Sequence, residues 1–450
     1  MNYNEVMEYV EELKAFGSVP GLDNMENLCQ RLEEPQKELK VIHIAGTNGK
    51  GSVQAFLTEI LRAAGYRVGS YISPTLFDYR ERIQINKKPI SQKELCRKME
   101  ILKGICQKLT AEGKPHPTAF EIETAMALWH FKEKKCDLVV LETGMGGLLD
   151  ATNIVVQTVV SVFTSISLDH MGVLGKTLGE IAVQKAGIMK PGTRAVALAG
   201  EQEVREVLVG KAKELGIPLT WADPSKVSQI RSSLDKQTFS YGELSKLTIS
   251  MAGRYQIDNS VLAIEAVKAL REAGYLISDK AVYEGLQRAI WPGRFQILAR
   301  KPLFIADGAH NRDGAARLAE TIRFYFTNRR ILYIIGILRD KEQDQILEAV
   351  CPMAEQIFTV PTQGERGLGA YELARIAGRY HASVTALDSV REAVELSYLM
   401  ADKDTVIIAL GSLSYLGELI SYVDQLGKER NIDKIIDKVG RDSHGKQRED

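Results

Sequence analysis

The residues from Val41 to Ser52 have the pattern of a phosphate-binding loop. They read Val-Ile-His-Ile-Ala-Gly-Thr-Asn-Gly-Lys-Gly-Ser, so an apolar strand runs into a glycine-rich turn, and apolar residues at helical spacing follow. In such a turn, backbone N–H groups and the positive end of the helix converge on one anion. Lys50 would supply a charge for the terminal phosphates, and the Ser52 hydroxyl would serve phosphate or metal. The sequence therefore predicts a nucleotide-phosphate site at Gly46, Thr47, Asn48, Gly49, Lys50, Gly51 and Ser52.

The loop departs from the common pattern G-x-x-x-x-G-K-[ST] at two positions. Ile44 stands where the first glycine would be, and Gly51 separates Lys50 from Ser52. A glycine-rich turn can also join a strand to a helix without binding any ligand. The lysine and the hydroxyl in the first helical turn favour the ligand-binding interpretation.

Two further oxygen-bearing side chains follow predicted strands. The apolar run 137–142 ends in Glu142, and the run 68–72 is followed by Ser73. Ligands of open α/β sheets bind along the carboxyl ends of the strands, so Glu142 is a candidate Mg²⁺ ligand. A solvent-facing strand end is the alternative for Glu142, and Ser73 suits a turn or a second oxygen ligand equally well.

A histidine and a lysine complete the set of candidate residues near this edge. Asp169 and His170 follow the apolar run 158–164, where His170 is either a hydrogen-bonded structural residue or a contact to metal or phosphate. Lys185 lies within the apolar stripe of a helix predicted over 177–189. It either snorkels at the margin of that stripe or is partly buried, with a lowered pKa or a covalent modification.

Three motifs have structural explanations of their own. Thr118 and Glu121 have the spacing of a capping box that opens a helix. Asn311 follows a predicted strand and is placed to cap the next helix. Arg294 lies in a rigid Trp-Pro-Gly-Arg-Phe turn, where it is either a linker residue or a guanidinium that reaches phosphate.

Short β-branched strands that alternate with helical patterns indicate α/β units around parallel sheets. A first series of strands is predicted at 39–45, 68–72, 137–142, 158–164 and 194–198. The pattern loosens over 221–250, and a helix is predicted over 259–273. A second series is predicted at 303–306, 331–337, 356–360 and 405–410, which places a domain boundary near 291–301.

The composition excludes several classes of protein. Of the 450 residues, 58 are Lys or Arg and 58 are Asp or Glu, so the formal net charge is zero, which argues against a general nucleic-acid or anionic-membrane binder. The five cysteines are widely spaced and never form Cys-x-x-Cys, as expected of reduced thiols in a cytoplasmic protein. The N-terminus lacks the pattern of a signal peptide, and apolar runs long enough for a membrane span are missing from the sequence.

The last segment, 428–450, is rich in charge and is expected to be a flexible tail or a frayed helix.

Taken together, these segments resemble the folylpolyglutamate synthase and dihydrofolate synthase family of the Mur ligase superfamily. The matching pieces occur in family order and span most of the chain: 43–52, 72–74, 120–121, 141–147, 150–153, 169–170, 185–188, 291–295, 307–311 and 411–413. One departure concerns Leu148, because the family commonly has Arg at that position. Without the guanidinium, this chain would lack whichever folate or metal-shell contact that arginine usually makes.

The resemblance implies an α/β fold with two domains and a tail. A P-loop-containing, Mur-ligase-type central domain would span 1–296. A smaller, Rossmann-like C-terminal domain that binds glutamate would span 297–427, and a charged tail would follow over 428–450.

The resemblance also implies roles for individual residues. The loop would hold the phosphates of ATP, Ser73 and Glu142 would bind one Mg²⁺, and His170 would bind a second together with Lys185 as its carbamate; Lys50, Lys185 and His170 are the expected catalytic residues. The nucleotide would further contact Asn259, Arg294, Asp307 and His310. The pterin would lie near Phe120, Glu121, Leu149, Asp150 and Ala151.

The implied reaction is ATP-dependent amide formation between L-glutamate and tetrahydrofolate, or dihydropteroate, through an acyl phosphate. The expected cofactors are ATP and two Mg²⁺ ions, without flavin, NAD or haem, and the expected partners are small molecules bound by a monomer. A cell-wall Mur ligase is a rival, although its UDP-binding domain would not fit in the 45 residues before Gly46. A P-loop regulatory module without ligase chemistry is the other rival.

Overall fold

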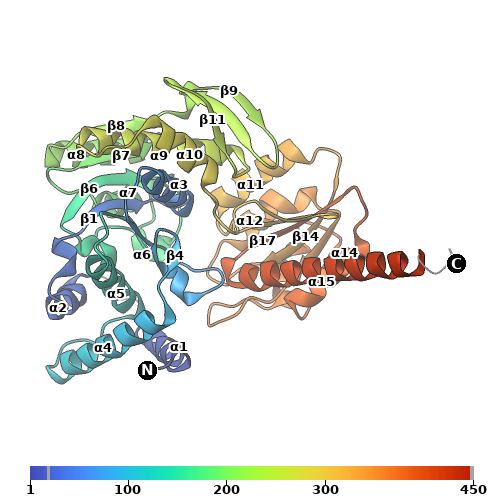
Figure 1. Cartoon of the computed structure of the whole chain (residues 1–450), viewed down its shortest axis with the longest axis horizontal. Helices are drawn as coiled ribbons and strands as arrows, with labels where there is room; N and C mark the ends of the chain where they lie inside the picture. The colour runs from blue at the N-terminus through green and yellow to red at the C-terminus, as the bar shows by residue number, and fades with distance from the viewer. Residues whose placement is uncertain (18–20, 446–450) are drawn as a thin grey trace. The chain divides into compact units, whose positions relative to one another are not determined.

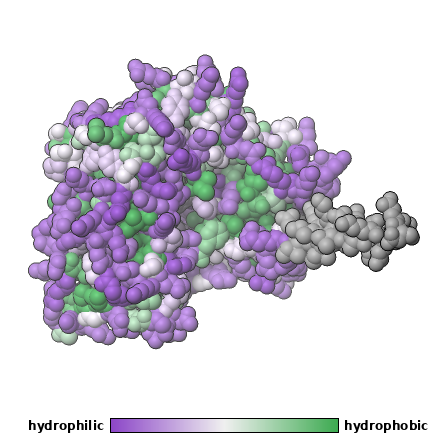
Figure 2. Space-filling view, viewed as in Figure 1, coloured by the Kyte–Doolittle hydropathy of each residue, from purple (hydrophilic) through white to green (hydrophobic). Residues whose placement is uncertain are grey.

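A computed structural model of the chain describes residues 1–17 and 21–445. The chain divides into two compact units, with unit 1 running from Met1 to Trp291 and unit 2 beginning at Pro292 (Figure 1). In the described part of the chain, every helix is too short or too polar to cross a bilayer. Polar side chains cover most of the face shown in Figure 2, with smaller apolar areas between them.

Unit 1 is built on an eight-stranded sheet with the order β4-β3-β2-β5-β1-β6-β7-β8. The strands are β1 (Lys40–Ala45), β2 (Val68–Tyr71), β3 (Ile83–Ile85), β4 (Lys88–Pro89), β5 (Leu138–Glu142), β6 (Gln157–Phe163), β7 (Arg194–Leu198) and β8 (Leu219–Ala222). The six strands from β2 to β8 are parallel, and β3 and β4 add an antiparallel edge. The phosphate loop follows the central strand β1, so its neighbours β5 and β6 end beside it.

Helices cover both faces of this sheet. Successive apolar side chains of β1 point to opposite faces, so each face must be buried. The helices of unit 1 are α1 (Tyr3–Leu13), α2 (Asp23–Arg31), α3 (Lys50–Ala63), α4 (Gln92–Ala111), α5 (Ala119–Glu133), α6 (Met171–Leu174), α7 (Leu178–Ala186), α8 (Gln202–Leu215), α9 (Arg254–Glu272) and α10 (Asp279–Arg288). Ile42 and Ile44 pack under α3, α9 and α10. Val41 packs on the opposite face with α1, α2, α4 and α5, and Ala45 packs there with α7 and α8.

The segment 221–250, where the sequence pattern loosens, forms a small antiparallel sheet. Its strands are β9 (Val227–Ser232), β10 (Gln237–Tyr241) and β11 (Leu244–Ile249), in the order β11-β10-β9. Phe239, Tyr241 and Leu247 join the core shared by α3 and α9. The outer face of this sheet is polar, so the apolar period was too weak to predict the strands.

Unit 2 contains a six-stranded sheet with the order β12-β13-β17-β14-β15-β16. The strands are β12 (Gln296–Arg300), β13 (Leu303–Asp307), β14 (Arg330–Gly336), β15 (Gln356–Thr359), β16 (Val384–Ala386) and β17 (Thr405–Gly411), and β12 alone among them runs antiparallel. The helices are α11 (Arg312–Tyr325), α12 (Gln343–Val350), α13 (Ala370–Ala377), α14 (Val390–Met400) and α15 (Leu413–Gly445). Helix α15 takes in part of the segment 428–450, and residues 446–450 lie outside the described residues.

The main predicted strands and caps are confirmed. The side chain of Asn311 caps α11 by accepting the backbone N–H of Gly314 at 2.8 Å, and Thr118 and Glu121 form the capping box of α5. Helix α9 begins at Arg254, five residues before the predicted start, because Gly253 precedes it at φ +94°. The short strands β3, β4, β8, β12 and β16 were not predicted.

Helix α10 packs unusually close to the helix that follows the phosphate loop. A Cβ built at Gly285 would lie 2.4 Å from the backbone N and Cα atoms of Ile60 in α3. We therefore expect Gly285→Ala to lower the free energy of unfolding of unit 1 by about 2 kcal/mol, as in other overpacked cores. Urea unfolding followed by tryptophan emission checks this, since Trp129, Trp221 and Trp291 all belong to unit 1.

The matched control is Gly210→Ala in the exposed part of α8, where an added Cβ meets open space. It should raise the free energy of unfolding by about 0.5 kcal/mol, because alanine favours the helix. Equal effects of the two substitutions would contradict the close α10–α3 contact.

Candidate active site

The phosphate loop ends at Gly49, which forms the N-cap of α3. Gly49 has φ +91°, and a Cβ there would lie 2.5 Å from Oδ1 of Asn259. A residue with a side chain would therefore be strained and would collide with α9. The loop is also held from the other side, because the backbone N–H of Thr47 donates to the carbonyl of Ser165 at 2.7 Å, and its hydroxyl donates to the carbonyl of Ser167 at 3.0 Å.

Two lysine side chains converge on the carbonyl oxygen of Gly46. Lys185 Nζ donates to this oxygen at 2.8 Å, and Lys50 Nζ donates to it at 3.2 Å. Lys50 also donates to the carbonyl of Thr47 at 3.3 Å. Two basic side chains thus share one carbonyl at the carboxyl end of β1, which makes this point suited to an anionic ligand.

Glu142 lies beside Lys50 at this point. Its Oε1 is 3.8 Å from Lys50 Nζ, and its side chain is only 6% exposed. It ends β5, as predicted, and the neighbouring strand β2 ends two residues before Ser73, which is half-buried. The carboxylate and the hydroxyl thus follow adjacent parallel strands and offer the hard oxygen ligands that Mg²⁺ prefers.

Burial decides between the two interpretations of Lys185. Its side chain is 3% exposed, so it does not snorkel to solvent. Burial lowers its pKa to about 7, and the neighbouring charge of Lys50 acts in the same direction, against opposing contributions from Asp169 and Asp150. A substantial fraction of Lys185 is therefore a neutral amine near neutral pH.

His170 is more exposed than Glu142 and Lys185. Its side chain is 38% exposed, and its Nε2 lies 3.9 Å from Oδ1 of Asp169. It has φ +52° and forms the N-cap of the short helix α6. The left-handed backbone at His170 turns the chain directly after the loop that follows β6.

The loop after β5 packs directly on an aromatic ring. A Cβ built at Gly144 would lie 2.5 Å from the ring of Phe120, so only glycine permits this approach to α5. The Phe120 ring lies 5.9 Å from that of Tyr71. Leu148 and Leu149 continue the loop with 41% and 47% exposure. The loop after the carboxyl end of β5 thus contacts an aromatic ring of α5 and carries two exposed leucines.

The two acidic residues predicted near the pterin serve as local caps. Asp150 caps the turn η4 (Ala151–Ile154) and accepts the backbone N–H of Met145 at 2.7 Å. Burial raises its pKa. Glu121 accepts the backbone N–H of Thr118 at 2.7 Å within the capping box. Both carboxylates are buried and bound to backbone groups, so the structure gives each a structural function.

Sequence reasoning missed one residue that packs on the loop. The half-buried ring of Trp291 covers Gly51, where a Cβ would lie 2.5 Å from the indole. Asn259, which was expected to contact the nucleotide, faces the same loop at Gly49 and donates to Gln256 Oε1 at 3.0 Å. The arginine of the Trp-Pro-Gly-Arg-Phe turn was singled out from the sequence. The contact of its tryptophan with the phosphate loop is visible only in the fold.

The remaining predicted residues lie in unit 2 and bind backbone groups of the same region. Arg294 Nη1 donates to the carbonyl of Gly308 at 2.7 Å, and His310 Nδ1 lies 2.8 Å from the same oxygen. Asp307 is 3% exposed and accepts the backbone N–H of Phe295 at 2.8 Å. These contacts fix the strand-to-helix turn after β13.

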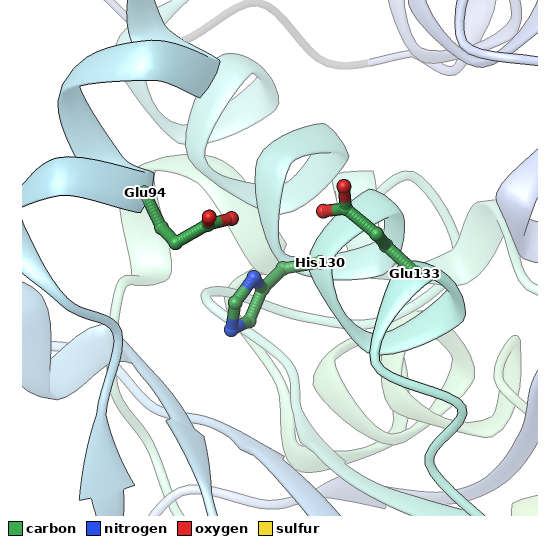
Figure 3. A group of neighbouring side chains, drawn as sticks. All are labelled: Glu94, His130 and Glu133. Atoms are coloured by element: carbon green, nitrogen blue, oxygen red, sulfur yellow. The ribbon is translucent and has the colours of Figure 1, made fainter.

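A cluster of two glutamates and one histidine lies between α4 and α5, as Figure 3 shows: Glu94, His130 and Glu133. Its carboxylates are already neutralised, because Lys98 Nζ lies 2.5 Å from Glu133, and Arg97 Nη2 lies 2.8 Å from Glu133 and 3.2 Å from Glu94. Burial, with Lys98 nearby, lowers the pKa of His130 to about 4. These cations disfavour a metal ion, so the cluster is best explained as an ion-pair network that joins two helices.

Comparison with known proteins identifies the family of the chain. The Mur ligase middle domain matches residues 44–267, and the Mur ligase glutamate ligase domain matches residues 293–413. The dihydrofolate synthase/folylpolyglutamate synthase of Bacillus subtilis (strain 168) is 34% identical over 428 residues, which cover 93% of this chain and 98% of that protein. The chain belongs to the dihydrofolate synthase/folylpolyglutamate synthase family of Mur ligases.

Solved structures agree with this assignment. Mycobacterium tuberculosis folylpolyglutamate synthase complexed with ADP has a TM-score of 0.86 at 30% identity, covering 93% of this chain and 98% of that one. E. coli FolC in complex with DHPP and ADP has a TM-score of 0.82 at 31% identity, with the same coverage. The predicted family, fold class and ligase activity are confirmed. Similarity to ligases over almost the whole chain argues against a P-loop regulatory module.

Burial of Lys185 predicts a pH-dependent cost in stability. Between a folded pKa of about 7 and the ordinary value of 10.5, the unfolded chain binds a proton that the folded chain does not. The cost is therefore complete below pH 7 and absent above pH 10.5. After allowance for the lost hydrogen bond to Gly46, Lys185→Met should raise the free energy of unfolding at pH 7 by about 3 kcal/mol.

Urea unfolding in CO₂-free buffer between pH 6.5 and 10.5 measures this gain, which should shrink steadily as the pH rises. Lys213→Met, at an exposed position of α8, is the control. A gain that stays constant across the pH range would contradict the buried, uncharged amine.

Proposed function

We propose that this Mur ligase family member joins L-glutamate to a reduced folate in an ATP-dependent reaction, with tetrahydrofolate as one acceptor and dihydropteroate as a second. The observation that carries the proposal is the pair of lysines on the Gly46 carbonyl, with Glu142 3.8 Å from Lys50. The complexes of relatives with ADP and with DHPP support the same substrate classes. We expect a cytoplasmic monomer, in keeping with five cysteines that are free thiols.

The phosphate loop is proposed to bind ATP, with Lys50 and the backbone of Gly49, Gly51 and Ser52 on its phosphates. The folate carboxylate attacks the γ-phosphorus, ADP leaves, and an acyl phosphate forms. The neutral amine of glutamate then attacks the acyl carbon, phosphate leaves, and the amide forms with loss of a proton. Positioning and charge neutralisation supply most of the catalysis in such transfers, so a protein nucleophile is not needed.

The metal ligands are proposed to be Ser73 and Glu142 for one Mg²⁺, and His170 and carbamylated Lys185 for a second. The donors fit, because a buried carboxylate and a hydroxyl follow adjacent strands beside the phosphate loop. Bound Mg²⁺ would neutralise part of the negative charge of the phosphate oxygens. A carbamate forms when the neutral Lys185 amine adds to CO₂ and releases one proton, which replaces a buried neutral amine by a negatively charged oxygen ligand.

Further roles complete the proposal. Phe120, Leu149 and the backbone around Glu121, Asp150 and Ala151 are proposed to contact the pterin. Asn259 of unit 1, and Arg294, Asp307 and His310 of unit 2, are proposed to contact the nucleotide. The last three belong to the domain that matches the glutamate ligase model.

The proposal requires phosphate release that depends on both acceptor and amino acid. Phosphate release from ATP should rise at least tenfold when a reduced folate and L-glutamate are both present, because the acyl phosphate forms only on a bound folate carboxylate. Tetrahydrofolate and dihydropteroate, assayed side by side with radiolabelled glutamate, show which acceptors are used. A rate of ATP hydrolysis that neither substrate changes would contradict the ligase proposal.

A second test addresses Lys185. Lys185→Ala should reduce kcat by about 100-fold or more, and short carboxylates such as acetate or formate should restore part of the activity by filling the space of the carbamate. Lys185→Arg, which keeps a positive charge but cannot be carbamylated, is the control and should resist rescue. An unimpaired Lys185→Ala enzyme would reject the carbamate.

A further inference from the structure

One buried amide connects the three elements that form the proposed Mg²⁺–ATP site. Gln54 lies in α3, one helical turn after Lys50, and is 1% exposed. Its Nε2 donates to the carbonyl of Tyr71 at 2.9 Å and to the carbonyl of Val140 at 3.1 Å. The helix that carries the phosphate loop is thereby bonded to β2 and to β5 at once.

The two carbonyls lie at equivalent places relative to the proposed metal ligands. Tyr71 ends β2 two residues before Ser73, and Val140 lies in β5 two residues before Glu142. The strands are parallel neighbours, with Ser70 opposite Val140. A shift of either strand along its axis would break one hydrogen bond of Gln54 and would change the spacing of Ser73 and Glu142 from the phosphate loop.

The orientation of the amide is fixed by its partners. Both N–H bonds of Nε2 are used on carbonyl oxygens, and a flipped amide would point its own oxygen at them. Gln54 Oε1 is buried, and in the described part of the chain it has no hydrogen-bond partner.

We infer that Gln54 is a positioning residue for the metal, which acts by holding the strand ends before Ser73 and Glu142 at a fixed distance from the phosphate loop. The inference rests on the proposed function, because it assumes that these two residues bind Mg²⁺. Both donors of Gln54 are used on backbone carbonyls, so it would act on the metal through the strands. Its effect should therefore appear in the metal-dependent part of nucleotide binding, while the phosphate loop still binds nucleotide without metal.

The test compares ADP binding with and without Mg²⁺ by titration calorimetry of the full chain. In Gln54→Met, which keeps the length of the side chain but loses both donors, the gain in ADP affinity from Mg²⁺ should fall about tenfold, as when groups that orient metal ligands are removed. ADP affinity in EDTA should stay within twofold of wild type. Binding of Mn²⁺ in the presence of ADP, followed by electron paramagnetic resonance, should weaken similarly.

Thr58→Val is the matched control. Thr58 Oγ1 and Ser70 Oγ lie 3.1 Å apart, so the substitution removes a buried contact between the same helix and β2, one turn further from the ligands. It should lower the melting temperature but leave the Mg²⁺ gain unchanged. Gln54→Asn, whose shorter amide cannot reach both carbonyls, replaces Gln54→Met if that variant does not fold.

The outcomes separate the two proposals. If Gln54→Met keeps the full Mg²⁺ gain, or if Thr58→Val loses as much of it, Gln54 is only a packing residue and the inference is overturned. If wild-type protein itself binds ADP no more tightly with Mg²⁺, the metal site of the proposed function fails, and the inference fails with it.

Discussion

The site depends on one carbonyl group that accepts hydrogen bonds from two lysines. The oxygen of Gly46 binds both Lys50 and Lys185, and Glu142 lies within reach of Lys50. Protonation of the buried Lys185 amine is costly, because burial and the neighbouring charge of Lys50 both oppose it. An anionic ligand, or conversion of Lys185 to a carbamate, would place a negative charge beside these basic groups.

The rest of unit 1 serves to hold that carbonyl in place. Strand β1 is central in the sheet, its apolar side chains are clamped between two layers of helices, and α3 is fixed from outside by α10. The loop itself is held by Asn259 on one side and by the backbone after β6 on the other. Such rigidity suits phosphoryl transfer, in which small misplacements are costly.

Much of this could be predicted from the sequence, because the relevant signals are local. A buried strand followed by a glycine-rich turn, a lysine and a hydroxyl specifies the phosphate loop, and Lys185 stood out as a charge within an apolar stripe. The family followed from the order of many short motifs. Short strands with mixed faces, such as β9 and β10, escaped because their burial depends on distant partners.

The structure also reveals contacts that the sequence could not. Gln54 is one of several polar residues that are buried in α3, and nothing local indicates that it reaches two strands. Trp291 packs tightly on Gly51, although the two residues lie 240 positions apart in the chain. Asp150, which was expected near the pterin, also caps the backbone of η4, and this contact was not predicted from the sequence.

The edge strand β4 has a consequence for how the protein behaves in a crowded cell. An open sheet edge displays unpaired N–H and C=O groups that can recruit another strand and start aggregation. Here the edge is only two residues long, and both Lys88 and Pro89 are exposed. The proline has no N–H to offer, and pairing with an apolar strand would remove water from the lysine charge. This edge of the large sheet is therefore a poor template for intermolecular β-sheet growth.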